Sequence, residues 1–422
     1  MERIFSTIDL KFCDASAISI LKSKAYHEIK KIVPEWAKLI QKGLEINEEE
    51  THRTIKHIFR SICVFFFILD EEIELKLSSQ FKRYLKSNLN RLYETNPDLF
   101  LYILLYHDIG RPFNREWHTF ESANLIEKQG LLSPKTSVPK KYIRILLGVI
   151  RHHLLLGTIF TGESSYLGAL ILLKDRSLHH VWESKEETEL FFQILILFTV
   201  IDIMGYQYSK IFDHYLDYYL KIKDNLVIGF NRVRALQNLE EKEHSLYLFF
   251  HRLDEEKFKW RVACALRIFQ FANTTKKLTE DFYFRKIDEG LERIGSNWSL
   301  FSRELSAWHP WIQFKYALPL TMILAAKSFS RTPINKQFVV NGDLFLFWDV
   351  CASKVKEIKT ERKKPAIYNV IFEFPRNWFL NHDILQLLNK EKLFSLIRTA
   401  QSFFNYEFES YQLYIKYKLR KG

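Results

Sequence analysis

An adjacent histidine and aspartate, His107 and Asp108, end a strongly apolar run in the sequence. The run begins at Tyr102, and Gly110 and Pro112 follow the pair and stop it. A buried imidazole beside a buried carboxylate is costly unless another group pairs with both. A divalent metal pairs with both, because it accepts neutral nitrogen and anionic oxygen ligands together. The pair therefore indicates a metal site, provided that the chain supplies further ligands.

Further histidines and one aspartate lie in or beside apolar segments elsewhere in the chain. They are His57, His118, the adjacent His152 and His153, and Asp202. An unpaired carboxylate at the end of an apolar run such as the one before Asp202 is strongly disfavoured, which supports a ligand role. His152 and His153 point about 100° apart on a helix, so they need not bind the same ion. One of them is expected as a ligand or phosphate contact, and the other as a packed side chain.

The order of these residues resembles the HD-domain superfamily of metal-dependent phosphohydrolases. The segment from Ile150 to Leu156, with Thr199-Val-Ile-Asp202 further on, is more particularly similar to one branch. That branch is the HD domain of the bacterial enzymes that remove uridylyl groups from nitrogen-regulatory PII proteins. The resemblance covers roughly residues 45 to 225. It implies a helical HD-type bundle and a phosphohydrolase activity.

The resemblance also implies a role for each candidate residue. The metal ligands would be His57, His107, Asp108 and Asp202. The second metal or phosphate contacts would be His118, His152 and His153. One or two divalent ions such as Mn, Fe or Mg suit such mixed nitrogen and oxygen ligands, and the sequence does not choose among them.

Two arginines are candidates for phosphate binding. Arg111 stands where the family commonly has lysine, and Arg151 directly precedes the histidine pair. An arginine keeps the positive charge and can hold a phosphate through two hydrogen bonds, but it cannot donate a proton in catalysis. For Arg151, a solvated helix position is an equally good interpretation.

The first ligand has two candidates. His57 is followed by Arg60, which matches the family's opening His-x-x-Arg, and His52 lies five residues earlier. Ser61 departs from the apolar residue that the family usually has four positions after the histidine. The distance along the chain from His57 to the His-Asp pair is longer than the family's usual spacing. This implies a longer second helix or an insert.

The composition requires a folded, helix-rich chain. Apolar residues make up 47%, while the chain has only 13 Gly and 10 Pro, which favours long helices and few tight turns. The longest apolar runs, Ser61–Leu69 and Leu190–Val200, are shorter than the ~20 residues that span a bilayer. They predict core helices and no transmembrane segment. Without a visible signal peptide, four widely spaced cysteines fit a reducing cytoplasm.

Helical patterns must position the candidate residues. Residues 1–45 are expected to form helices that pack on the core, and residues 46–225 the HD-type domain. Within that domain, helices are expected from about residue 47, from 97 to 107, from 118 to 130, from 140 to 153 and from 187 to 206. Residues 226–334 are expected to form a second helical domain. Residues 335–422 contain strand patterns at 337–340, 366–374 and 411–417, which predict a small α/β module.

The expected activity is hydrolysis of a phosphoester of a nucleotide, a signalling nucleotide or a nucleotidylated protein. The chain lacks the Gly-Gly-Ser segment of the nucleotidyltransferase domain in the uridylyl-removing enzymes, so it is not a full-length enzyme of that kind. The charge of +12 fits a phosphorylated or nucleic-acid partner, or else solvated helix faces. Two alternatives stay open: a non-catalytic regulator that binds nucleotide or RNA, and a nuclease.

Overall fold

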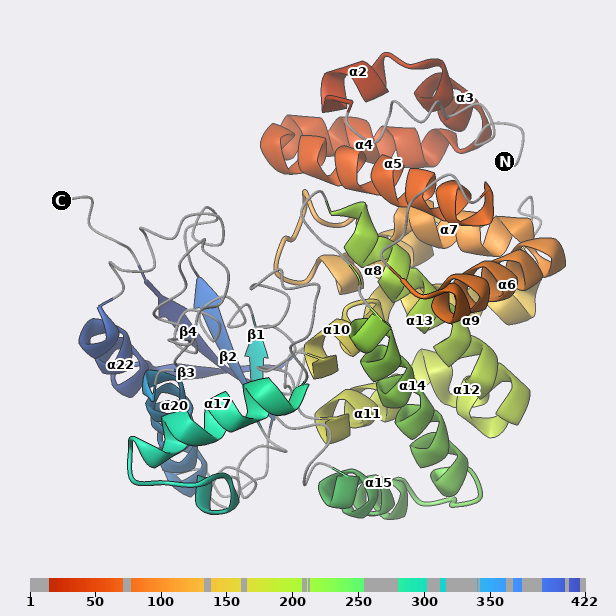
Figure 1. Cartoon of the computed structure of the whole chain (residues 1–422). Helices are drawn as coiled ribbons and strands as arrows, with labels where there is room; N and C mark the ends of the chain where they lie inside the picture. Colours follow the sequence, from red (N-terminus) through yellow and green to blue (C-terminus); the bar gives the residue numbers. More distant parts are fainter. Residues whose placement is uncertain are drawn as a thin grey trace. The chain divides into compact units, whose positions relative to one another are not determined.

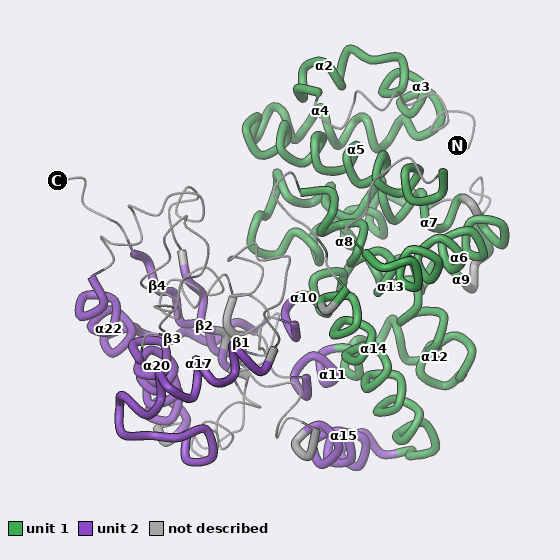
Figure 2. The backbone as a smooth tube through the Cα atoms, viewed as in Figure 1, with its two compact units in different colours: residues 1–157, 172–237 green, residues 158–171, 238–422 purple. Residues whose placement is uncertain are grey.

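The computed structural model is mainly helical (Figure 1), which confirms the predicted fold class at this level. The residues that it describes are 15–70, 77–132, 138–160, 165–206, 211, 213–253, 280–301, 312–315, 340, 342–361, 367–373, 389–406 and 410–417. The chain divides into two compact units (Figure 2). The first contains residues 1–157 and 172–237, and the second contains residues 158–171 and 238–422.

The first unit is a bundle of helices. They are α2 (Ala17–Leu21), α3 (Lys24–Ile32), α4 (Pro34–Ile46), α5 (Glu48–Asp70), α6 (Ser79–Thr95), α7 (Pro97–Tyr106), α8 (His118–Lys128), α9 (Lys140–His152), the 3₁₀ turn η2 (Arg176–Leu178), α12 (His179–Glu183), α13 (Lys185–Gly205) and α14 (Asp213–Val233). Two short helices cross the unit boundary along the chain, α10 (Leu155–Phe160) and α11 (Ser165–Lys174). The N-terminal helices α2 and α4 both pack on α5.

Helix α13 is the central element of this bundle. Its N-terminus is capped by Ser184, whose hydroxyl accepts a hydrogen bond from the backbone N–H of Glu187 at 3.2 Å. It packs against α5, α7, α9 and α14. Because it is surrounded in this way, its sequence is apolar on nearly all sides. The last turn nevertheless carries the buried carboxylate of Asp202.

Two helical stretches pass a test of length and composition for crossing a membrane, Tyr142–Phe160 and Lys185–Gly205. The second contains the apolar run Leu190–Val200 noted in the sequence and extends past it, whereas the first combines most of α9 with α10. In each, 72% of the apolar window is buried inside the structure. Helices of the core of a folded protein pass the same test, and Lys185–Gly205 agrees with the core helix that the sequence predicts at Leu190–Val200.

Local sequence explains how α7 delivers the His-Asp pair. Asn96 caps the helix by accepting a hydrogen bond from the backbone N–H of Leu99 at 2.9 Å. After the last helical turn, the backbone N–H of Gly110 donates to the hydroxyl of Ser122 on α8 at 2.9 Å. A side chain at Gly110 would overlap the α8 backbone at Ser122. The glycine therefore lets the turn after α7 lie directly against α8, where His118 begins the helix.

The second unit contains a small mixed sheet near the C-terminus. Its described elements are α15 (Leu239–Leu253), α17 (Glu280–Glu292), β1 (Ile312–Lys315), α20 (Asp343–Glu361), β2 (Ile367–Glu373), α22 (Lys390–Arg398), β3 (Ser402–Asn405) and β4 (Ser410–Lys416). The strand order is β1-β2-β4-β3. β2 pairs in parallel with β1 and β4, and β3 pairs antiparallel with β4.

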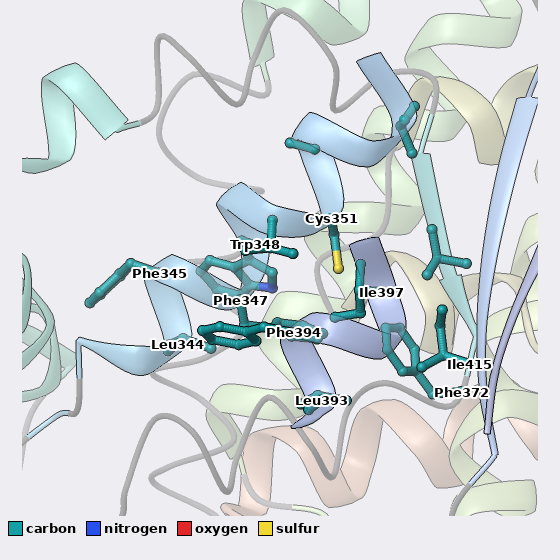
Figure 3. Packing of buried hydrophobic residues seen from close by; sticks show 14 of the residues in the cluster. Leu344, Phe345, Phe347, Trp348, Cys351, Phe372, Leu393, Phe394, Ile397 and Ile415 are labelled. Carbon is teal, nitrogen blue, oxygen red and sulfur yellow. The ribbon is translucent and has the colours of Figure 1, made fainter. Parts of the chain in front are cut away.

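Helices α20 and α22 pack their apolar side chains against one another and the sheet (Figure 3). Phe347 and Trp348 of α20 lie beside Phe394 of α22, and Phe372 of β2 and Ile415 of β4 extend the cluster from the sheet. Alternate residues of β2 and β4 belong to this core, because successive side chains of a strand point to opposite faces of the sheet.

The structure confirms the predicted α/β character of the C-terminal part and corrects its extent. Strand β2 lies within the predicted segment 366–374, and β4 matches the predicted segment 411–417 to within one residue at each end. Strand β1 falls in the range 226–334, which was expected to be wholly helical, and β3 was also missed. Each is 4 residues long, too short for an alternating pattern to be visible. Most of the strand expected at 337–340 lies outside the described residues.

Candidate metal centre

A cluster of buried histidines and aspartates occupies the middle of the first unit. It is built from α5, the turn after α7, the start of α8, the end of α9 and the end of α13. Its members are His57, His107, Asp108, His118, His153 and Asp202. None of these side chains is more than a few per cent exposed, with His107 at 0% and Asp108 at 1%. The structure thus brings together six of the residues that the sequence singled out.

One group within the cluster consists of His57, His107 and Asp108. One ligand atom from each lies within 4.8 Å of the others, so the group could hold a metal ion. Asp202 joins it, since its Oδ1 is 2.7 Å from Nε2 of His57 and 3.4 Å from Nε2 of His107. Two imidazoles and two carboxylates therefore converge.

A second group shares Asp108 with the first. Asp108, His118 and His153 also place ligand atoms within 4.8 Å of one another. Oδ1 of Asp108 is 3.3 Å from Nε2 of His118 and 3.6 Å from Nε2 of His153. Its Oδ2 lies 3.9 Å from Nε2 of His107. Asp108 therefore turns one oxygen towards each group.

Three of the histidines are oriented in the same way. Nδ1–H donates to the carbonyl three residues earlier: His107 to Leu104 at 2.9 Å, His118 to Arg115 at 2.9 Å and His153 to Ile150 at 2.8 Å. A carbonyl can only accept, so in the neutral ring the proton sits on Nδ1. The lone pair of Nε2 then faces the cluster, which is the arrangement of metal-binding histidines.

The donor set fits a divalent cation. Among the described residues, Nε2 of His107 is a buried polar atom without a hydrogen-bond partner. An unpaired buried polar atom is costly, and a cation would remove that cost. Neutral imidazole and anionic carboxylate together suit Mn, Fe and similar ions. Magnesium prefers oxygen ligands, so this histidine-rich set fits it less well.

The electrostatics of the cluster keep both carboxylates ionised. Burial by itself raises the pKa of Asp108, but the positive charges of His107, His118 and Arg111 outweigh burial and hold it well below the usual range. Burial likewise opposes ionisation of Asp202, and the imidazoles of His107 and His57 beside its carboxylate lower its pKa strongly. Ionised carboxylates are the form that binds a metal.

His153 is the histidine that burial affects most clearly. Burial lowers its pKa to about 4, although the nearby carboxylates of Asp202 and Asp108 act in the opposite direction. The ring is therefore neutral at physiological pH. That is the form able to bind a cation through Nε2.

This pKa predicts how the stability of the metal-free protein depends on pH. Between pH 6.5 and pH 4 the unfolded chain binds a proton at residue 153 and the folded chain does not. The free energy of unfolding should therefore fall as the pH falls through this window. The pKa of His107 is raised, because Asp108 and Asp202 outweigh burial, and His107 is common to wild type and a His153 variant, so a comparison of the two reports on residue 153.

Denaturant unfolding of chelator-treated protein at several pH values measures the effect. Wild type should lose more stability than His153→Gln between these limits. Equal slopes for the two proteins would contradict the prediction.

Arg111 lies at the edge of the cluster, between three oxygen atoms. Its Nε donates to Glu50 at 2.9 Å, and its Nη1 donates to Asp108 at 3.0 Å and to the hydroxyl of Tyr206 at 2.9 Å. Nη2 has no partner in the described part of the chain, and the side chain is 21% exposed. The ring of Tyr206 in turn stacks on His57, with centroids 4.1 Å apart.

Glu50 and Tyr206 were missed by sequence reasoning. Glu50 belongs to an acidic first turn of α5, where such residues are expected for the helix dipole alone. It is nevertheless 3% exposed. Tyr206 is one of many tyrosines, and nothing in its neighbourhood marked it.

The structure places His152 and Arg151 away from the shared carboxylate. His152 pairs with Asp175 through Nε2 at 2.8 Å. Nη1 of Arg151 also donates to Asp175, at 2.9 Å, and Nη2 donates to Glu127 at 3.1 Å. These contacts engage the polar atoms of both side chains. Adjacent residues on α9 point in different directions, which is why His152 lies away from Asp108. Of the histidine pair, His153 alone contributes to the groups around Asp108.

The two candidates for the first histidine also differ in position. His57 is buried beside Asp202, whereas the side chain of His52 is 27% exposed and lies 3.9 Å from Glu48 on the helix surface. The geometry therefore favours His57.

Comparison of the chain with models of protein families, with curated proteins and with solved structures gives no match.

Proposed function

We propose that this chain is an HD-type metal-dependent phosphohydrolase that hydrolyses a phosphoester. The observation that carries the proposal is the position of Asp108, whose two oxygens face two histidine groups. A carboxylate shared between two such groups suits a pair of metal ions, and paired ions are common in enzymes that cleave phosphoesters. The order of the residues along the chain, which resembles the HD superfamily, supports the same reading.

In this proposal His57, His107, Asp108 and Asp202 hold one ion, and Asp108, His118 and His153 hold the other. A bound divalent metal supplies a nucleophile at neutral pH by lowering the pKa of water, and it polarises the phosphoryl oxygen. The backbone carbonyls behind His107, His118 and His153 hold each ring by Nδ1, so that Nε2 would be free to bind an ion.

Arg111 supplies the positive charge that a phosphoryl group requires. Its Nε and Nη1 are held by Glu50, Asp108 and Tyr206, which fixes the plane of the guanidinium. The remaining Nη2 can then donate to a phosphoryl oxygen without any rearrangement. A donor held in place before reaction stabilises developing negative charge most effectively. Arginine remains protonated throughout, so it acts by charge and not as an acid.

The substrate class follows from the resemblance and the charge of the chain. A nucleotide, a signalling nucleotide or a nucleotidylated protein each offers a phosphoester to such a centre, and the net charge of +12 attracts all three. We place the activity in the cytoplasm, where thiols stay reduced, since Cys351 is a buried thiol that forms no disulfide within the described part of the chain.

A hydrolysis panel tests the proposal. Full-length protein would be loaded separately with Mn²⁺, Fe²⁺ and Mg²⁺ and assayed on phosphomonoesters, phosphodiesters, cyclic nucleotides, single-stranded RNA and a uridylylated protein. Metal-dependent release of product from at least one substrate is expected, together with its loss in His107→Ala. Cleavage of RNA alone, with a steep salt dependence, would instead favour the nuclease reading. No hydrolysis with any ion would overturn the proposal in favour of a binding role.

A further inference from the structure

His57 differs from the other histidines of the centre in how its ring is held. His107, His118 and His153 each lie at a helix end and donate Nδ1–H to a backbone carbonyl. His57 lies in the middle of α5, where the carbonyls of the neighbouring turns are used by the helix itself. Its Nε2 faces Asp202, and its Nδ1 is buried without a hydrogen-bond partner among the residues that the structure describes.

A second buried atom without a partner lies next to that nitrogen. Ser61 is one helical turn after His57, on the same face of α5, and its hydroxyl is also buried and has no hydrogen-bond partner in the described part of the chain. The surroundings of Gly205 on α13 show that the hydroxyl of Ser61 and Nδ1 of His57 lie near the same point. A Cβ added there would overlap the hydroxyl of Ser61 and lie 3.3 Å from Nδ1 of His57. The two unpaired atoms therefore border the same point of α13.

We infer that Ser61 is the positioning residue for His57: its hydroxyl pairs with Nδ1 and turns Nε2 towards the metal. The inference rests on the proposed function, in which His57 is a ligand. When Nε2 binds a cation, the ring proton must sit on Nδ1 and needs an acceptor. A serine hydroxyl can provide it after rotation between staggered χ1 positions.

A hydroxyl group can pair with Nδ1 of His57 both with and without a bound metal ion. Without metal, Nε2 lies 2.7 Å from the carboxylate of Asp202 and can donate to it, so that Nδ1 accepts. A hydroxyl then donates, whereas a carbonyl could only accept. The absence of a side chain at Gly205 leaves the room that Ser61 and His57 share.

The experiment compares two substitutions on the same face of α5. Ser61→Ala removes the proposed partner. Thr54→Val is the matched control. The hydroxyl of Thr54 is likewise buried without a partner among the described residues, but it is not one of the atoms nearest to the added Cβ at Gly205. Chelator-treated full-length protein would be titrated with Co²⁺. The heat of binding would be measured by calorimetry, and the visible absorption spectrum would be recorded as each ion binds. Circular dichroism would establish that each variant is folded.

Ser61→Ala should weaken one Co²⁺ site about 10- to 100-fold, the range for removing the outer partner of a histidine ligand. The second site, which does not contain His57, should keep its affinity and its spectrum. Thr54→Val should bind as wild type does. A general loss of structure would weaken both sites and would overturn the inference, as would unchanged binding by Ser61→Ala. If wild type binds no Co²⁺, the proposed function itself fails and the inference falls with it.

Discussion

Asp108→Asn is expected to abolish phosphoester hydrolysis, because it removes the one carboxylate that both histidine groups share. Asparagine keeps the shape of the side chain but offers a neutral oxygen in place of an anion. Both ions should then bind weakly. The loss of activity should exceed the roughly 100-fold effect that is typical for an outer partner of a ligand.

Two further substitutions give this prediction its controls. Asp98→Asn changes a partly exposed aspartate in the first turn of α7, the helix that precedes Asp108, and should leave hydrolysis unchanged. His118→Gln removes a ligand of the second group alone, the one that Asp108 forms with His118 and His153. It should therefore impair hydrolysis less than Asp108→Asn does. Steady-state assays at saturating Mn²⁺ measure all three. Activity of Asp108→Asn within about tenfold of wild type would rule out a shared metal ligand.

Arg111→Met is expected to destabilise the metal-free protein by about 3–5 kcal/mol, the usual effect of removing one partner from a buried ion pair. The substitution leaves Glu50 and Asp108, which are 3% and 1% exposed, without their bonds to the guanidinium. Burial by itself lowers the pKa of Arg111, but Tyr206, Asp108 and Glu50 raise it well above the ordinary value. The cationic form is therefore held by the fold.

Metal should reduce this loss, since a cation beside Asp108 replaces part of the missing charge. Urea unfolding of chelator-treated and Mn²⁺-loaded protein would measure both values. Arg144→Met, on the exposed side of α9, is the matched control and should change stability by no more than about 0.5 kcal/mol. A similarly small effect of Arg111→Met in the metal-free protein would show that its ion pairs do not support the fold.

Much of the centre could be anticipated from single residues. The apolar run before His107 and Asp108 indicated burial, because such side chains are not left unpaired in a core. The same reasoning applied to Asp202, which lies at the buried end of α13. Sequence could not choose between His152 and His153, since that depends on the rotation of α9 about its axis. The contact of His152 with Asp175 fixes that rotation.

The surroundings of the centre could not be anticipated in this way. Glu50 lies 61 residues from Arg111 along the chain, and only the packing of α5 beside the turn after α7 makes them partners.

Strand β1 was missed for a related reason. Its 4 residues carry too little pattern, and its parallel pairing with β2 joins segments far apart in sequence. Contacts of this kind are properties of the fold and not of a local segment.

The most direct test of the account is the number of metal ions bound per chain. Wild type and Asp108→Asn would be incubated with Mn²⁺, Fe²⁺ or Mg²⁺, dialysed, and measured by elemental analysis against protein concentration. The shared carboxylate predicts a ratio near two in wild type for at least one transition metal, and near zero in the variant. A wild-type ratio near zero for every ion would contradict the metal centre and, with it, the proposed hydrolase.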